Sequence, residues 1–346
     1  MSPYAMSMLL SSLSAGTIIT FTSTHWFLAW VGLEINTLAM VPLMSKMQHP
    51  RATEAATKYF LTQATASALL MFAAATNAGY TGEWTIMNMQ TTIPSIMLMT
   101  ALMIKLAVAP FHLWLPDVIQ GLDLMTCLIL STWQKLAPFA LLVQINGELN
   151  PTLMTLMGML SIIIGGWGGL NQPQMRKMMA YSSIAHLGWM IIVLTHSSHL
   201  TMLNLLMYFI MTSSMFLMMM NLSSTSINKA SMSWMKNLPL MSTMMLVLMS
   251  LGGLPPMSGF LPKWLILEEI VKQNMTLVAT IAALSTMLSL FFYLRLSYTV
   301  SLTTSPTTAS SKMLWRLKMN LNKVMSTMII MSTMLLPLTP TILNLF

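Results

Sequence analysis

Long apolar segments with almost no charged residues constrain the fold of this chain most. A helix needs about 20 mainly apolar residues to cross roughly 30 Å of hydrocarbon, and the sequence predicts eleven such segments. They cover residues 3–22, 25–45, 55–78, 93–121, 124–146, 153–171, 178–195, 200–222, 240–271, 276–301 and 324–345. Only 7% of the residues are charged and the mean hydropathy is +0.71, which is too apolar for a water-exposed surface. We therefore predict an all-α, polytopic membrane protein.

The composition excludes several other classes of protein. The net charge of +8 arises from 16 basic residues scattered singly between apolar runs, so no basic face for nucleic acid is predicted. A single cysteine, Cys127, excludes a disulfide framework, a Cys-held iron–sulfur cluster and a Cys-rich zinc site. We therefore expect this chain to bind no metal and no cofactor by itself, and to be surrounded by lipid.

The methionine content indicates a mitochondrial gene, and the start of the chain predicts no cleaved targeting segment. Residues 1–33 contain no Lys or Arg, so they resemble neither a secretory signal nor a transit peptide, and no cleavage is expected. Met occurs 42 times, often where Ile or Val would serve as well. This excess is expected when a genetic code reads an extra codon as Met, and mitochondrial codes do so.

Basic residues in the connecting loops predict the orientation. Eleven of them fall on the side reached after every second segment, against Lys272 alone on the other side. They are Lys46, Arg51, Lys58, Arg176, Lys177, Lys229, Lys236, Lys312, Arg316, Lys318 and Lys323. Because Lys and Arg accumulate on the inner side, this side is predicted to face the matrix. The N-terminus is then in the matrix and the C-terminus in the intermembrane space.

Charged residues inside the predicted segments are Glu34, Lys105, Lys135, Lys263 and Arg295. A charge at the bilayer centre costs about 2.5 to 3.5 kcal/mol, so four unpaired cations would cost roughly 10 to 14 kcal/mol. Such groups are retained only when they are paired, hydrated or functional. Arg295 lies near the basic end of its segment, which favours a side chain that extends to the membrane surface.

Two of the segments are interrupted by proline. Pro110 in the fourth segment cannot donate to the carbonyl four residues earlier, which frees a polar group in the membrane interior. Pro255 and Pro256 do the same in the ninth segment. Each interruption lies within a few residues of a buried lysine, Lys105 or Lys263. We predict non-helical backbone at both places, facing protein or water rather than lipid.

The positions of these interruptions predict an inverted repeat. If segments one to five and six to ten are two halves, each interrupted segment is the fourth of its half, and the halves have opposite orientations. Interrupted helices at matching positions mark the ion path in transporters. The predicted domains are a first helix, 1–22, which residues 23–146 complete to the first five-helix repeat, a second repeat over 153–301, and a matrix loop with a C-terminal helix over 302–346.

Three stretches carry a resemblance to a known family: KLAVAPFHLWLPD at 105–117, YSSIAHLG at 181–188 and GGLPPMSGFLPK at 252–263. They resemble signature segments of the proton-translocating, antiporter-like subunits of respiratory complex I, and are also similar to multisubunit Na⁺/H⁺ antiporters. The resemblance covers nearly the whole chain and is strongest to animal, in particular mammalian, mitochondrial members. Members usually have fourteen helices, and this chain, like other animal versions, lacks the first three.

The resemblance implies a non-redox subunit of a proton-translocating NADH:ubiquinone reductase in the mitochondrial inner membrane. It implies a half-channel acid, Glu34, paired with Lys105, followed by a central Lys135 and a terminal Lys263. NAD, FMN, iron–sulfur clusters and ubiquinone are then expected in partner subunits of the membrane and redox arms. General chemistry agrees, because burial disfavours a charged lysine and a nearby carboxylate favours it. A lysine whose partner moves can therefore take up and release a proton.

Each of these charged residues also has a structural interpretation. Glu34 and Lys105 could form a static ion pair that holds two helices together. Lys135 and Lys263 could extend their amines to the membrane surface along the helix. The central position of Lys135, about 17 Å from either end of its segment, argues against this.

Histidines and a glycine-rich run remain open in the same way. His186, deep in an unbroken segment, is either a proton relay or a hydrogen-bonded structural residue. His112 caps a carbonyl freed by Pro110 or joins the proton path. His196 and His199 lack a third ligand, so no metal site is predicted. The run at 165–169 is predicted to pack helices closely through its small residues rather than to bind a dinucleotide.

Two other functions are compatible with these patterns. One is a stand-alone Na⁺/H⁺ antiporter, which sodium dependence of transport would distinguish. The other is a structural spacer that conducts nothing, which neutral substitution of the buried lysines would distinguish.

Overall fold

Helices form nearly all of the computed structural model, which describes residues 2–89, 91–233, 237–302 and 323–343. Within these ranges there is no strand, and two isolated bridges join His25 to Thr85 and Gln174 to Ser226. Eight helices of the described ranges are long and apolar enough to cross a membrane. The predicted all-α polytopic class is confirmed, and the count of eleven spans stays a prediction. Of the eleven basic loop residues, Lys236, Lys312, Arg316 and Lys318 lie outside the described residues.

Two compact units make up the chain, Met1–Ser161 and Ile162–Phe346. The helices of the first unit are α1 (Pro3–Thr22), α2 (Trp26–Met44), η1 (Ser45–Met47), α3 (Pro50–Thr81), α4 (Thr92–Leu106), α5 (Trp114–Gly121), α6 (Leu124–Ser131), α7 (Trp133–Gln144) and η2 (Asn146–Glu148). Proline at the first position starts α1 and α3, where its missing N–H leaves no helical bond unmade. The unit boundary falls inside α8 (Pro151–Gly168).

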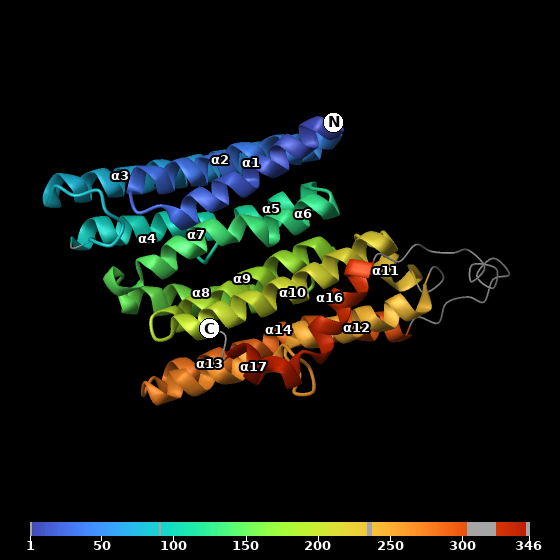
Figure 1. Cartoon of the computed structure of the whole chain (residues 1–346). Coiled ribbons are helices and arrows are strands. Elements are labelled where there is room, and N and C mark those ends of the chain that lie inside the picture. Colours follow the sequence, from blue (N-terminus) through green and yellow to red (C-terminus); the bar gives the residue numbers. More distant parts are fainter. Residues whose placement is uncertain (1, 90, 234–236, 303–322, 344–346) are drawn as a thin grey trace. The chain divides into compact units, whose positions relative to one another are not determined.

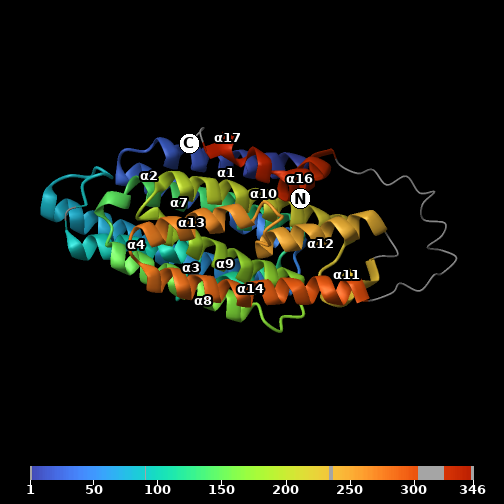
Figure 2. The same cartoon turned by 90° about the horizontal axis from the view of Figure 1, so that it is seen from below.

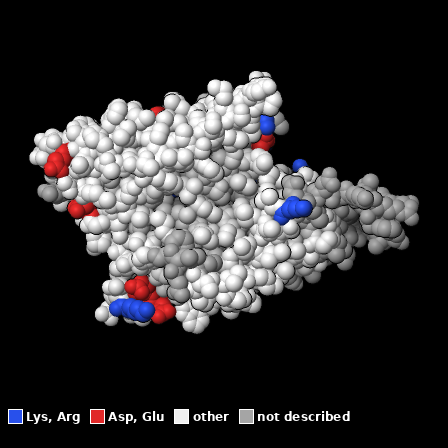
Figure 3. Space-filling model, in the orientation of Figure 1, with Lys and Arg blue, Asp and Glu red and all other residues white. Residues whose placement is uncertain are grey.

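The second unit is built around α9 (Met175–Leu194), which is almost entirely buried. The other helices are α10 (Ser198–Leu222), α11 (Ile227–Met232), α12 (Leu238–Gly252), α13 (Phe260–Lys272), α14 (Thr276–Leu302), α16 (Lys323–Met334), η5 (Leu336–Leu338) and α17 (Thr339–Leu343). Their outward faces carry few charges. Figure 3 shows one face of the molecule, on which the Lys, Arg, Asp and Glu residues drawn in colour form only a few small groups.

Non-helical backbone interrupts both proline-containing segments, as predicted. The fourth segment is divided into α4 and α5, which both pack against α3 (Figure 1). The ninth is divided into α12 and α13, which both pack against α14 (Figure 2). The helices before the breaks end at residues in the left-handed conformation, Ala107 with φ 61° and Gly253 with φ 81°. Whether the broken backbone faces lipid stays untested, since Pro110 and Pro255 are exposed in the isolated chain.

Gly259 fixes the second break against the end of α12. A Cβ atom at this position would lie 1.9 Å from the carbonyl oxygen of Ser250, so only glycine fits without movement of the backbone. Proline therefore interrupts the helix, and Gly259 lets the chain after the break pack against the backbone of α12.

A third interruption was not predicted. The segment over 124–146 was expected to be continuous, but α6 and α7 are separated at Thr132, whose φ and ψ are −111° and −70°. Pro138 within α7 has no N–H to donate to the Gln134 carbonyl and crowds it. The Thr132 hydroxyl also bonds the Leu128 carbonyl at 2.7 Å, a contact that bends helices.

Close helix packing explains the glycine-rich run at 165–169, as predicted. Added Cβ atoms would lie 2.7 Å from the Ala185 backbone at Gly165, 2.3 Å from the Tyr181 ring at Gly168 and 2.7 Å from the Phe292 ring at Gly169. The small residues thus let this part of the chain approach α9 and α14 closely.

Candidate functional site

Two buried lysines meet at one small cavity in the first unit. Lys105 occupies the last turn of α4 and is 6% exposed, and Lys135 lies in the first turn of α7 and is 4% exposed. Both line a cavity with about 20 Å³ of room for the centre of a water molecule, which we call the lysine cavity. A water needs roughly 10 to 15 Å³ measured in this way. The lysine cavity is therefore large enough for about one water molecule beside the amines.

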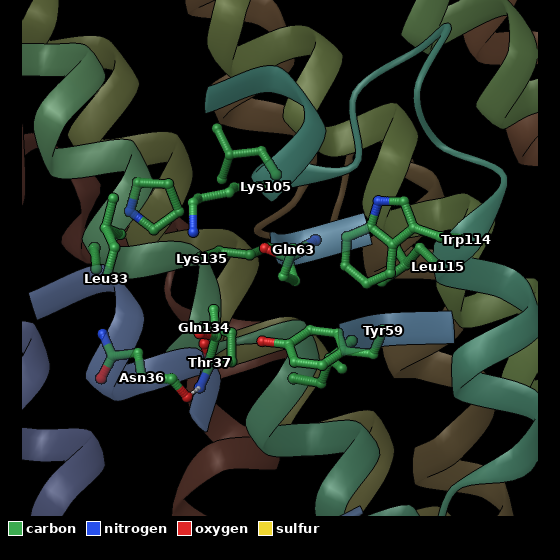
Figure 4. A pocket seen from close by; sticks show the side chains of 14 residues that line it. Leu33, Asn36, Thr37, Tyr59, Gln63, Lys105, Trp114, Leu115, Gln134 and Lys135 are labelled. Atoms are coloured by element: carbon green, nitrogen blue, oxygen red, sulfur yellow. Dashed lines mark hydrogen bonds between the residues drawn. The ribbon is translucent and has the colours of Figure 1, made fainter. Parts of the chain in front are cut away.

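Polar side chains from α2, α3 and α7 complete the lysine cavity. Figure 4 shows both lysine side chains extending into the same space beside Gln63, and the Tyr59 hydroxyl pointing toward Gln134. Gln134 donates from Nε2 to the Asn36 carbonyl oxygen at 3.4 Å. Sequence reasoning missed Tyr59, Gln63 and Gln134 as site residues. The available signal was the two amide side chains inside otherwise apolar segments.

Glu34 lies beside this cavity rather than in it. Leu33, Asn36 and Thr37 are spaced at i, i+3 and i+4 and line the cavity, so Glu34 projects about 100° around α2 from Leu33. No ion pair within 4.0 Å joins Glu34 to Lys105 in the described structure, so their pairing stays a prediction. The carboxylate is near enough for Coulomb attraction to reach Lys105. Its Oε2 atom is buried without a hydrogen-bond partner.

Trp114 spans the break between α4 and α5. Its Nε1–H donates to the Ile104 carbonyl oxygen at 3.1 Å, and its ring packs edge-on against Tyr59 with centroids 5.8 Å apart. His112 is buried and its Nδ1 lies 3.2 Å from the Pro110 carbonyl oxygen. The indole thus bonds a carbonyl near the end of α4, whereas His112 lies beside a carbonyl within the break, and the cap expected of His112 stays a prediction.

In the second unit, Lys263 bridges the other break. It lies in the first turn of α13, and its Nζ donates at 2.8 Å to the carbonyl oxygen of Gly252, the last residue of α12. The bond satisfies a carbonyl that the end of α12 leaves without a helical partner. Lys263 is half-buried rather than fully exposed, so its amine does not simply extend to the surface.

His186 and Lys263 share a second small cavity. Its volume for water centres is about 10 Å³, and its other polar lining residues include Ser182 on α9 and Tyr293 on α14. Tyr208 on α10 contacts His186, with ring centroids 5.6 Å apart. The structure thus brings together the histidine and the lysine that the sequence singled out separately. Tyr208 and Tyr293 were not predicted as site residues, since buried tyrosines are common in cores.

Arg295 and the two histidines that follow α9, His196 and His199, lie in surroundings that indicate no site. Arg295 is exposed and donates from Nη1 to Asn171 Oδ1 at 2.7 Å, in line with the expected surface position. In the described ranges, neither His196 nor His199 belongs to a group of three metal-ligating side chains.

Comparison with protein families gives two matches that together cover residues 23–343. Residues 23–289 match the family described as NADH:quinone oxidoreductase/Mrp antiporter, TM, and residues 290–343 match NADH dehydrogenase subunit 2 C-terminus. Relatives named NADH-ubiquinone oxidoreductase chain 2 are 56% identical in Tetraodon nigroviridis and 57% identical in Latimeria chalumnae. These alignments cover 100% and 99% of this chain, and 99% and 98% of the relatives.

Solved structures share the fold. A chain of respiratory complex I from Thermus thermophilus is 26% identical with a TM-score of 0.87, over 99% of this chain and 80% of that one. A chain of the Mrp complex from Dietzia is 19% identical with a TM-score of 0.76, over 87% of this chain and 61% of that one, and indicates the fold alone. From its family matches and its full-length vertebrate relatives, the chain belongs to the NADH-ubiquinone oxidoreductase chain 2 family.

Proposed function

We propose that this chain, a proton-translocating subunit of the membrane arm of NADH-ubiquinone oxidoreductase, conducts protons through Glu34, Lys105, Lys135 and Lys263. The observation that carries the proposal is the lysine cavity. Two lysines on different helices, both almost fully buried, open onto one space that admits water. Structural lysines have no need of a shared hydrated space, and each would be costly to keep in the bilayer.

Like charges at one cavity make proton transfer between the lysines favourable. A proton on Lys105 disfavours a second proton on Lys135, because two ammonium groups repel strongly in a medium of low dielectric constant. The pair therefore holds one proton more readily than two. Glu34 lies on the flank of Lys105, so a displacement of its carboxylate changes which lysine holds the proton.

The broken helices also belong to the proposed path, because Lys105 and Lys263 each lie beside a break. Lys105 precedes its break and Lys263 follows its break, and Lys263 is bonded to the freed end of α12. His186 shares the second cavity with Lys263 and is the candidate relay toward it. His112, bonded to Pro110, is assigned to the structure of the first break rather than to the path.

Energy for transport comes from outside this chain. Moving one proton charge against 100 mV costs about 2.3 kcal/mol. NAD, FMN, iron–sulfur clusters and ubiquinone are assigned to partner subunits, whose electron transfer supplies that energy. The chain is then an obligate member of a larger assembly with other membrane-arm subunits and lipids as its neighbours.

The proposed topology is that of a multi-pass protein of the inner membrane with eleven spans. Eight long apolar spans, one of which is divided into α6 and α7, and three further divided or shorter segments support this number. Two inverted repeats, over 1–146 and 153–301, each contain one proline break. The N-terminus lies in the matrix, the loop within 302–346 lies in the matrix as well, and the C-terminus lies in the intermembrane space.

Sodium transport fits the lysine cavity less well than proton transport. A sodium ion prefers carboxylate and carbonyl oxygen ligands, whereas the charged groups that line this cavity are two lysines. A purely structural spacer has no use for the cavity. A spacer predicts that neutral substitution of Lys105 leaves the proton yield of the complex unchanged, and an antiporter predicts that transport depends on sodium.

Lys105→Met in the complete complex tests the proposal. We expect normal abundance of the complex and fewer protons translocated per electron, measured in vesicles that oxidise NADH. Lys272→Met is the matched control, because Lys272 is an exposed lysine paired with Glu268 at the end of α13. A normal proton yield in Lys105→Met would overturn the proposal.

A further inference from the structure

A third cavity, larger than the two small ones described above, opens at the surface between α3 and α5. It has a volume of about 220 Å³, and its charged lining consists of Arg51, Glu54 and Lys58 on α3 with Asp117 on α5. We call it the surface cavity. Lys58 Nζ lies 2.9 Å from Glu54 Oε1 and 3.4 Å from Asp117 Oδ2. Two carboxylates therefore share one ammonium group.

Both carboxylates of the surface cavity remain accessible to water. The Glu54 side chain is 62% exposed and that of Asp117 is 50% exposed. Their charges are balanced by Arg51 and Lys58, so the cluster is neutral when fully ionised. A proton from solution can bind to either carboxylate while Lys58 stays paired with the other one. The cluster can thus hold and release a proton without leaving an isolated charge.

Helix register links the surface cavity to the lysine cavity. Lys58 on α3 pairs with Asp117 on α5, and the next residue of α3, Tyr59, packs against Trp114, three residues before Asp117. Tyr59 and Trp114 both line the lysine cavity, as does Gln63, about one turn further along α3. Consecutive residues of α3, Lys58 and Tyr59, and residues three apart in α5, Trp114 and Asp117, therefore line the two cavities from the same stretch of this helix pair.

Tyr59 brings a hydroxyl to the lysine cavity from the position that follows Lys58 in α3. Its side chain is 2% exposed, and its hydroxyl points into the lysine cavity (Figure 4). A hydroxyl both accepts and donates a hydrogen bond. It can accept a proton on one side and release its own on the other, with no net change. The neighbouring indole cannot do so, because its N–H is a donor only and is bonded to Ile104.

We propose that Asp117 and Glu54 collect protons from water on the basic side of the membrane and deliver them through Tyr59 to the lysine cavity. A carboxylate oxygen first binds a proton. That O–H bond then breaks as the proton passes to the Tyr59 hydroxyl, which releases its own proton to a neutral lysine amine. The amine becomes ammonium, and the carboxylate and the hydroxyl return to their starting forms. This proposal rests on the proposed conduction by Lys105 and Lys135.

The experiment compares two variants that break the same ion pair in different ways. Asp117→Asn removes the proton-binding group, whereas Lys58→Met removes its partner and keeps the carboxylate. Proton uptake from the medium is measured in inverted inner-membrane vesicles that oxidise NADH, whose matrix side faces the medium. We expect Asp117→Asn to lower proton uptake per electron, most strongly together with Glu54→Gln, while Lys58→Met retains most of it. Equal losses in Asp117→Asn and Lys58→Met would show that the pair only anchors α5, and would overturn the proposal.

Further variants distinguish proton delivery from the surface cavity from conduction by the lysines. Tyr59→Phe should lower proton uptake although the ring packing is kept. Asp117→Glu keeps a carboxylate, so it should retain the proton uptake that Asp117→Asn loses. Glu268→Gln is the control, because Glu268 is an exposed glutamate paired with Lys272. Reduced uptake in Lys105→Met with normal uptake in Asp117→Asn would refute proton delivery from the surface cavity and leave the proposed function intact. Normal uptake in both would refute the two together.

Discussion

Replacing Glu34 with glutamine distinguishes a carboxylate that holds helices together from one that acts on proton transfer. Had Glu34 formed a buried ion pair with Lys105, its removal would leave an unpaired ammonium group and cost about 3 to 5 kcal/mol. The structure has no such pair, and Glu34 Oε2 has no hydrogen-bond partner to lose. The amide of glutamine has a similar size. We therefore expect Glu34→Gln to change the stability by less than about 1 kcal/mol.

The assay for Glu34→Gln is the abundance of the assembled complex on native gels, measured beside the protons translocated per electron. Abundance should match the parent, and the proton yield should fall, because the attraction that holds a proton at Lys105 is lost. Glu148→Gln is the control, since Glu148 is exposed in η2. Loss of the complex in Glu34→Gln, restored when Lys105→Met is added, would show a structural ion pair and refute the reasoning.

Three further outcomes follow from the breaks and the topology. Trp114→Phe removes one hydrogen bond to Ile104, whose carbonyl keeps a backbone partner, so heat inactivation of the complex should reveal a loss of about 1 kcal/mol; no shift would contradict the assigned bond. Gly259→Ala places a methyl group against the Ser250 carbonyl and should cost about 3 kcal/mol, seen as a lower abundance of the complex, whereas normal abundance would contradict this packing. A label attached near Lys323 should react only from the matrix side, and labelling from the intermembrane side would reverse the proposed orientation.

Hydropathy and proline were sufficient to predict much of the fold. Apolar length predicted most helices because the bilayer sets the length of a spanning segment. Pro110 and Pro255 predicted the two breaks because proline cannot donate a backbone hydrogen bond. The break at Thr132 was missed, although Pro138 and a threonine within the same segment gave a signal for it. A proline inside a helix does not always interrupt it, so that signal alone was ambiguous.

The buried charges of the site were predictable, but their contacts were not. Lys105 and Lys135 stood out because a charge in the bilayer is costly. The rotation of each helix decides which side chains meet, and one apolar segment reveals little about that rotation. This is why the pairing of Glu34 with Lys105 rested on the family resemblance, and why the bond from Trp114 to the Ile104 carbonyl was not predicted. The bond of Lys263 to Gly252 depends on how the chain folds back at the break, which no local pattern specifies.

The proton yield of Lys105→Met, Lys135→Met and the double variant tests the shared lysine cavity most directly. All three are measured in the complete complex at equal abundance, as protons translocated per electron from NADH. Two lysines on one path predict that each single variant lowers the yield and that the double variant lowers it no further, because either change already blocks the path. Losses that add, or a normal yield in either single variant, would contradict conduction through this cavity.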